Sequence, residues 1–232
     1  MNRSLFVVPA FAIPAFVVAS ALLVPALKGN TAQSAHAAPT TAATKKVAAP
    51  SLTGTWAIDP AHSTIGFAVR HVVINDVHGT FDDFEGTIKA NAQDITKSSV
   101  SFKAKVASIN TRVPARDGHL KSPDFFDAAK YPELTFQSTK IVKTKDGFRA
   151  IGTLTMHGTP RTIIIPFTLH GPVVDGFGYT RVGVSGNLSL NRQDYGVKWN
   201  QTLDNGGLAV DNVVHVNLDL EAIKDGSGPK KS

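Results

Sequence analysis

Residues 99–106 read SVSFKAKV, and this stretch indicates most plainly how the chain folds. Its apolar members Val100, Phe102, Ala104 and Val106 alternate with serine and lysine. Successive side chains of a β-strand point to opposite faces of a sheet, so this alternation gives one apolar face and one polar face. The stretch therefore predicts an antiparallel strand that packs against a core on one side and meets water on the other.

The same two-residue period recurs along the rest of the chain. It returns in residues 65–69, 134–136, 148–156, 163–169, 182–190 and 214–220. Turn-forming residues separate these stretches, namely Asn75-Asp76, Asp146-Gly147, His157-Gly158-Thr159-Pro160, Asp175-Gly176 and Asn205-Gly206-Gly207. The pattern predicts about eight strands. A sheet of that size curls, and closure into a barrel removes its exposed edges.

The interior of such a barrel is a separate question. An eight-stranded barrel is just wide enough either to be filled by side chains or to hold one slender ligand. The strands use mostly Val, Ile, Ala and Gly, which leave space but also build ordinary tight cores. The periodicity alone leaves both alternatives open.

One segment departs from the strand pattern. Ser122 has the character of a helix N-cap and Pro123 that of a first helical residue, which predicts a short helix over residues 123–129. Inserted between two strands, this helix would lie across an end or flank of the barrel and present Phe125 and Phe126 inward.

The N-terminus carries the features of an export signal. Residues 1–37 combine a basic start, an apolar run over 5–27 and the small-x-small site Ala35-His36-Ala37, so we interpret them as a cleaved signal of a periplasmic or secreted protein. The apolar run is also long enough for an uncleaved anchor, which would tie the protein to a membrane. The other predicted divisions are a flexible Ala/Thr/Pro linker over 38–51, a barrel domain over 52–225 and a basic disordered tail over 226–232.

The charge of the chain lies in its ends. The net charge is +6, but six of the 24 Lys and Arg residues lie outside 52–225, whereas all 18 Asp and Glu residues lie inside it. A formally neutral domain lacks the basic face that nucleic-acid binding requires. The chain has no cysteine, and its histidines show no zinc-type spacing, so neither disulfides nor a metal site is expected.

Four motifs span most of the domain. They are Trp56-x-Ile58-Asp59-x-x-His62-Ser63-x-Ile65-x-Phe67-x-Val69-x-His71, then Arg116-Asp117-x-His119-Leu120-x-Ser122-x-Asp124-Phe125-Phe126-Asp127 with Tyr131-Pro132, then Gly152-x-Leu154-Thr155-Met156-His157-Gly158, and Arg192-x-Asp194-Tyr195-Gly196. In this order, over about 54–224, they resemble the YceI family of polyisoprenoid-binding, lipocalin-like periplasmic proteins. The resemblance implies an all-β fold, an extended eight-stranded antiparallel lipocalin-like barrel with one short inserted helix. It also implies a long hydrophobic pore that holds an isoprenoid or fatty-acid-like chain.

A set of apolar residues on the faces expected to point inward would line such a pore. The set consists of Phe67, Val69, Phe81, Phe84, Phe102, Phe125, Phe126, Phe136, Ile165 and Phe167. As pocket lining they would bury the methyl branches of a chain, and as plain core they would simply fill the barrel. The resemblance favours the pocket for the set, while for any single phenylalanine the core remains the alternative.

Arg116, Asp117 and His119 form the densest group of reactive side chains. Because they precede the predicted helix, we expect them on a loop near the barrel mouth. The favoured interpretation is a structural network that fixes the helix to the barrel. The alternative is that Arg116 and His119 bind the head group of a ligand. Asp59, His62 and Ser63 lie too close together in sequence for a hydrolase triad and predict a turn network instead.

The sequence therefore predicts non-catalytic binding, transport or storage of a long-chain amphiphile, a polyisoprenoid, a quinone or a fatty-acid-type lipid, with no cofactor and no nucleic-acid partner. One alternative is a hydrolase or redox enzyme that acts on a lipid with Asp117 and His119. Another is a stress-response interaction module with a filled core. A homodimer is neither indicated nor excluded by the sequence.

Overall fold

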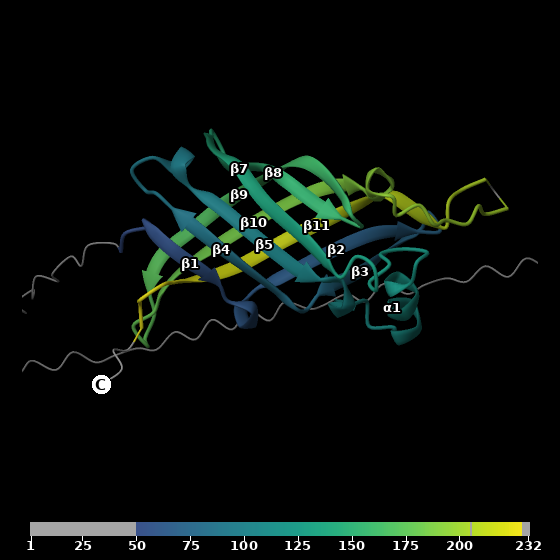
Figure 1. Ribbon diagram of the computed structural model, residues 1–232, viewed down its shortest axis with the longest axis horizontal. Coiled ribbons are helices and arrows are strands. Elements are labelled where there is room, and N and C mark those ends of the chain that lie inside the picture. The colour runs from purple at the N-terminus through teal and green to yellow at the C-terminus, as the bar shows by residue number, and fades with distance from the viewer. Residues whose placement is uncertain (1–49, 205, 229–232) are drawn as a thin grey trace, which may run out of the picture. The chain divides into compact units, whose positions relative to one another are not determined.

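The computed structural model describes residues 50–204 and 206–228, which form an antiparallel β-barrel with one α-helix (Figure 1). The predicted signal segment 1–37 lies outside the described residues, as do most of the predicted linker 38–51 and residues 229–232 of the predicted tail.

Eleven strand segments build the wall of the barrel. They are β1 (Gly54–Ile58), β2 (Thr64–His71), β3 (Asn75–Phe81), β4 (Phe84–Ala90), β5 (Ser99–Lys105), β6 (Ile109–Asn110), β7 (Glu133–Thr144), β8 (Gly147–Met156), β9 (Thr159–Val174), β10 (Thr180–Asn191) and β11 (Val210–Lys224). The helix α1 spans Pro114–Lys121, and the short 3-10 helices are η1 (Pro60–His62), η2 (Ile95–Lys97), η3 (Val106–Ser108) and η4 (Arg192–Tyr195). The segments pair in the order β1-β4-β5-β7-β8-β9-β10-β11-β2-β3-β6, and β1 also pairs with β11, which closes the sheet on itself.

The eleven segments correspond to eight strands, because three strands are interrupted. β1 and β2 both pair with β11 and are the two parts of one strand, broken at η1. β3 and β4 pair with β2 and β1 in turn and are broken at Asp82-Asp83, and β5 and β6 are broken at η3. The closed eight-stranded antiparallel barrel predicted from the sequence is confirmed.

The alternation in residues 99–106 has the predicted structural basis. Ser101, Lys103 and Lys105 of β5 are exposed, whereas Ala104 and Val106 are each 1% exposed. The inward side chains of β5 meet those of its neighbours, since Phe102 lies opposite Phe136 of β7. The polar residues remain in water, so the burial of this one face drives the pairing.

The predicted helix over 123–129 is wrong, and the helix α1 lies earlier in the chain, at Pro114–Lys121. Pro114 provides the proline at its start, and Ser122 ends it as the C-cap, with the Ser122 N–H bonded to the His119 carbonyl. Residues 122–131 form consecutive turns, and Asp127 has a φ of 48°, which no α-helix allows. A proline does occupy the first helical position, but it is Pro114 and not Pro123.

The turn predicted at Asn75-Asp76 is also wrong, because both residues begin β3. The chain reverses at Val72 and Val73, which have φ values of 43° and 69°, and Val73 is 60% exposed. β-Branched residues rarely adopt this left-handed region, so no composition rule would place the turn there.

Candidate functional site

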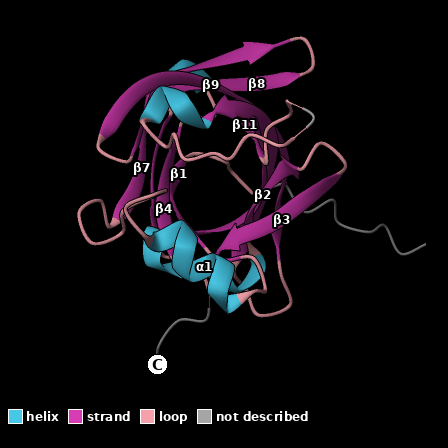
Figure 2. Ribbon diagram, turned by 90° about the vertical axis from the view of Figure 1, so that its right-hand side faces the viewer, coloured by secondary structure: helices cyan, strands magenta, loops and turns pink. Residues whose placement is uncertain are grey.

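The barrel encloses an apolar cavity of about 270 Å³ that is lined by 38 residues. Among the described residues that line it, only Ser98 and Arg192 are polar. Figure 2 looks at one end of the barrel, with α1 in front of the wall formed by the strands. This volume lies near the lower end of the range for small-molecule pockets, about 300–1,000 Å³. Its lining leaves dispersion and apolar burial as the main forces for any occupant.

The wall is the inward face of the alternating strands. In β11, Val216 and Leu218 line the cavity, while Asn217 between them is exposed. Apart from the buried Val182, the residues of β9, β10 and β11 that line the cavity are only partly buried, since they border open space rather than a packed core.

Nine of the ten residues expected to line a pore lie on the cavity wall. They are Phe67, Val69, Phe81, Phe102, Phe125, Phe126, Phe136, Ile165 and Phe167. The tenth, Phe84, is 7% exposed within the core, and its ring centroid lies 6.1 Å from that of Phe102. Phe84 therefore supports the wall behind Phe102 without reaching the cavity.

One end of the barrel is closed by Trp56. This residue is 0% exposed, lines the cavity and donates from Nε1 to the Leu52 carbonyl at 2.9 Å. The ammonium of Lys224 lies 5.6 Å from the centre of its ring on the outer side.

At the opposite end, the buried guanidinium of Arg192 holds a loop in place. Arg192 is 5% exposed, and its donors reach the carbonyls of Val197, Trp199, Val210 and Asp211 at 2.9, 2.8, 3.3 and 2.9 Å. Burial lowers the pKa of Arg192 from its ordinary value. Because all four acceptors are backbone carbonyls, this one side chain ties residues 197–199 and 210–211 together next to η4.

An aromatic cluster joins that loop to α1. The rings of His119, Phe125 and Trp199 lie with all three centroid separations at 5.0 Å. Phe125 lines the cavity, and His119 Nε2 is 2.9 Å from an Asp124 carboxylate oxygen. The cluster therefore packs the helix, the turns after it and the loop against one another beside the cavity.

Arg116, Asp117 and His119 lie in α1, so the prediction that they sit on a loop before a helix is wrong. One Asp117 oxygen accepts from the Thr111 N–H at 2.8 Å and from the Thr111 hydroxyl at 2.6 Å. Arg116 donates to the Thr111 hydroxyl at 2.7 Å and to its carbonyl at 2.8 Å. These bonds fix the helix to the end of β6, and none of the three residues belongs to the cavity lining.

Asp117 and His119 do not act as a pair. They are two positions apart on a helix, which directs their side chains to different sides. Asp117 bonds to Thr111, and His119 bonds to Asp124. The arrangement required of a general base and its orienting acid is not formed by these two residues.

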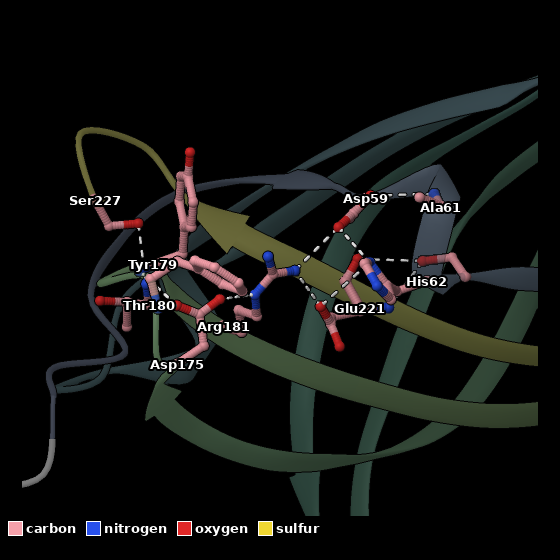
Figure 3. Close-up of polar contacts among 11 residues, drawn as sticks. Asp59, Ala61, His62, Asp175, Tyr179, Thr180, Arg181, Glu221 and Ser227 are labelled. Carbon is pink, nitrogen blue, oxygen red and sulfur yellow. Dashed lines mark hydrogen bonds and ion pairs between the residues drawn. The ribbon is translucent and has the colours of Figure 1, made fainter. Parts of the chain in front are cut away.

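A second polar cluster lies outside the barrel, where β1 and β11 join (Figure 3). Arg181 of β10 bonds to Asp59 at 3.0 Å, to Asp175 at 2.6 Å and to Glu221. The Nδ1 atom of His62 lies 2.8 Å from a carboxylate oxygen of Asp59. Asp59, His62 and Glu221 come close enough together to ligate a metal ion, but the guanidinium of Arg181 already bridges both carboxylates.

The ionisation of this cluster follows from its contacts. Partial burial raises the pKa of Asp59, but hydrogen bonds from His62 and Arg181 outweigh this, and its pKa lies below the ordinary value. The hydrogen bond from Arg181 lowers the pKa of Asp175. Ser63 bonds to the backbone of Glu221, not to His62, so the predicted turn network describes these residues better than a triad.

Two residues with evident structural roles were not predicted from the sequence. The sequence indicates Arg192 only as part of the motif Arg192-x-Asp194-Tyr195-Gly196, and no local pattern signals its backbone acceptors. Pro166 lies in the middle of a predicted strand, where a missing N–H donor signals an interrupted ladder.

Comparison with known proteins agrees with this geometry. The model of the YceI-like domain family matches residues 56–222. A UPF0312 protein of Pseudomonas savastanoi is 37% identical over 148 residues, which cover 62% of this chain and 77% of that protein.

Two solved structures share the fold. Burkholderia cenocepacia BcnA matches with a TM-score of 0.62 and 22% identity, over 71% of this chain and 98% of that one. A polyisoprenoid binding domain from Saccharophagus degradans matches with a TM-score of 0.55 and 17% identity, over 73% of this chain and 98% of that one. Across the described part of the chain, no helix has the length and apolar character needed to span a membrane.

Proposed function

Because the chain belongs to the YceI-like domain family, we propose that it binds one long-chain apolar molecule inside the barrel and carries or stores it outside the cytoplasm. The observation that carries the proposal is the cavity itself, whose lining contains two polar side chains among 38 residues. The similarity to a structure named as a polyisoprenoid binding domain favours a prenyl chain among the possible occupants.

Apolar burial supplies the binding free energy. Each methylene group moved from water to such a lining contributes about 0.8 kcal/mol, so a chain of several isoprene units can bind without ionic contacts. A chain that cannot cross water alone is protected within the wall of the barrel. The alternative of an interaction module with a filled core is disfavoured, since the interior holds open space.

The binding role requires no covalent step. Asp117 and His119, the pair considered for an enzyme, are engaged with Thr111 and Asp124 and lie outside the cavity lining. Arg116, Asp117 and His119 thus serve the attachment of α1 in this proposal. Nine of the ten predicted pocket residues act as lining, and Phe84 supports the wall.

The proposed location follows from residues 1–37, which we interpret as an export signal. A carrier of apolar chains is useful where a chain must leave one membrane and reach another through water. Periplasmic or secreted placement agrees with the family resemblance.

Native mass spectrometry tests the proposal. The full chain, expressed in a bacterium with its own N-terminus, is purified from the envelope, and its mass is compared before and after solvent extraction. We expect a stoichiometric prenyl or acyl lipid, identified in the extract. A protein that shows its bare mass, and takes up neither geranylgeraniol, a long-chain ubiquinone nor palmitate, contradicts the proposal.

A cavity-filling variant makes the test specific to the site. Val216 faces the cavity from β11, so Val216→Trp places a large ring in the space that the ligand requires. Ser101→Trp adds the same ring to the exposed outer face of β5 and is the matched control. We expect loss of bound lipid in the first variant only, with both variants folded by circular dichroism.

A further inference from the structure

The backbone ladder between β9 and β10 stops part-way along the two strands. Their ladder runs from Val174 and Thr180 to its last pair, Phe167 and Gly186. β9 nevertheless continues to Thr159, paired with β8, and β10 continues to Asn191, paired with β11. Within the described residues, the remaining five positions of β10 thus have a neighbour on one side only.

Pro166 accounts for the point at which the ladder stops. The Pro166 carbonyl oxygen lies 2.8 Å from the position that a Cβ on Gly186 would occupy, so the backbone polar groups of Pro166 face β10. The next pair of an extended ladder would join Pro166 to Asn187 and would need an N–H donor from Pro166. Proline has none, and it therefore ends the pairing there.

Side-chain contacts close the other end of this gap. Arg161 Nε donates to the Asp194 carbonyl at 3.1 Å, and His157 Nδ1 lies 3.2 Å from the Tyr195 carbonyl. The two strand edges between these contacts and the last ladder pair thus border a slot. At about 3.4 Å per residue, residues 162–166 give it a length of roughly 17 Å.

The inner surface of the slot is apolar, whereas its outer surface carries the exposed residues Thr162, Asn187, Ser189 and Asn191 beside Ile164 and Pro166. Its inner edges carry four residues of the cavity lining, Ile163, Ile165, Leu188 and Leu190. Its outer edge carries Ile164, which is 52% exposed.

Phe167 connects the inside of the barrel with the outside. It lines the cavity, and it also lines a separate surface hollow of about 620 Å³ whose other residues include Pro166, Gly186 and Asn187. The hollow thus lies over the point where the ladder ends. Among the described residues, Phe167 is the one that the linings of the cavity and of the hollow share.

We propose that the slot between residues 162–166 of β9 and 187–191 of β10 is a lateral portal through which an alkyl or prenyl chain enters and leaves the cavity. This inference rests on the proposed function and adds the path of the ligand to it. The chain passes sideways between the two strand edges, next to Ile164, with Phe167 at one margin.

The alternative paths through the barrel ends are obstructed by bonded groups. One end is closed by Trp56, bonded to Leu52. At the other, Arg192 fastens the loop over residues 197–211, and His119, Phe125 and Trp199 pack beside it. Separation of the slot edges breaks no pair of the β9–β10 ladder, whereas passage through either end displaces these hydrogen bonds and ring contacts.

Cysteine cross-linking tests the portal, because the natural chain contains no cysteine. Continuation of the register places Ile164 opposite Ser189, and both are exposed. The double variant Ile164→Cys/Ser189→Cys is joined by oxidation or by a short bis-maleimide. The matched control is Thr168→Cys/Ser185→Cys, a true pair in the laddered part of the same two strands. Both are made in the full chain and verified by mass.

Loading is followed by stopped-flow fluorescence with cis-parinaric acid, and release by dilution into lipid vesicles. We expect the slot cross-link to slow loading and release roughly tenfold or more with little change in equilibrium affinity, as for a locked gate. The control cross-link leaves both rates unchanged, and reduction of the slot disulfide restores them. Equal rates in the locked slot and the control overturn the portal but leave the proposed function intact. Failure of the reduced protein to bind overturns the proposed function and the portal together.

Pro166→Thr provides a second test that needs no cross-link. It supplies the missing N–H toward Asn187 and is expected to extend the ladder, which hydrogen exchange detects as new protection of the Ile164 and Ser189 amides. Slower loading in this variant agrees with the portal. New protection with unchanged loading contradicts it.

Discussion

Replacement of Arg192 by methionine tests how the end of the barrel is held. The substitution preserves much of the aliphatic length but removes every donor to the carbonyls of Val197, Trp199 and Asp211, at 2.9, 2.8 and 2.9 Å, and to the more distant Val210. A buried polar group left without a partner costs about 1–3 kcal/mol.

The expected loss follows from those contacts. Three well-placed acceptors give a gross cost of roughly 3–9 kcal/mol, and water that reaches the loop after it moves recovers part of this. Relief of the desolvated charge recovers more, so we expect a net loss of about 3–5 kcal/mol in the free energy of unfolding. Arg192→Lys keeps the charge but cannot reach all four carbonyls, and we expect a smaller loss.

Urea denaturation measures the change, with tryptophan fluorescence as the signal. Trp199 lies in the loop itself, so its emission reports the local event, while circular dichroism reports the barrel. Arg149→Met, at an exposed arginine of β8, is the control and should change stability by less than about 0.5 kcal/mol. If Arg192→Met lies within about 1 kcal/mol of the natural protein, the loop does not depend on this side chain and the reasoning fails.

Three further outcomes are expected. The pKa values of Asp59 and Asp175 are lowered in the folded protein, so both carboxylates stabilise it fully above their unfolded pKa of about 3.9. This stability is lost as the pH falls through the lower folded pKa values, and the urea midpoint should therefore drop steeply below pH 4. A midpoint that stays constant there contradicts the role of the Arg181 network. Val73→Asn should stabilise the protein by about 1 kcal/mol in thermal unfolding, since asparagine tolerates the φ of 69° that valine does not, and a loss would refute strain at this turn. Phe84→Ala should lower the free energy of unfolding, measured by urea denaturation, by about 3–5 kcal/mol. The stoichiometry of bound lipid should stay unchanged, because Phe84 is buried outside the cavity lining.

The strand pattern could be predicted because burial of one face determines it locally. Residues 99–106 alternate since their environment alternates, and the same holds for β8 to β11. The helix was misplaced because both Pro114 and Pro123 satisfy the rule for a first helical residue. The choice between them depends on long-range contacts, namely the bonds of Arg116 and Asp117 to Thr111.

The site was predictable in part for the same reason. Inward positions follow from the strand period, which is why nine of ten expected residues lie on the cavity wall. Phe84 differs because the break at Asp82-Asp83 shifts its environment, and no local pattern indicates that break. The four acceptors of Arg192 come from a loop that ends 19 residues later, a distance that sequence reasoning cannot bridge without the fold.

Arg181 links two seams of the barrel, meaning the lines along which β1 pairs with β11 and β9 pairs with β10. The β1–β11 seam has three residue pairs, Trp56 to Ile58 against Ala222 to Lys224, and the Arg181 cluster fastens it from outside. Arg181 also bonds to Asp175 in the β9–β10 turn, so it fixes the laddered end of the β9–β10 seam. The half without a ladder lies at the far end of the same two strands. Because β9 and β10 are held together at one end and unpaired at the other, their unpaired ends can separate and come together again without unfolding of the barrel. Loss of Arg181 should therefore increase hydrogen exchange at the laddered end of β9 and β10, whereas the amides that face the slot are expected to exchange fast with or without Arg181. Protection that is uniform along both strands would contradict this division of the seam.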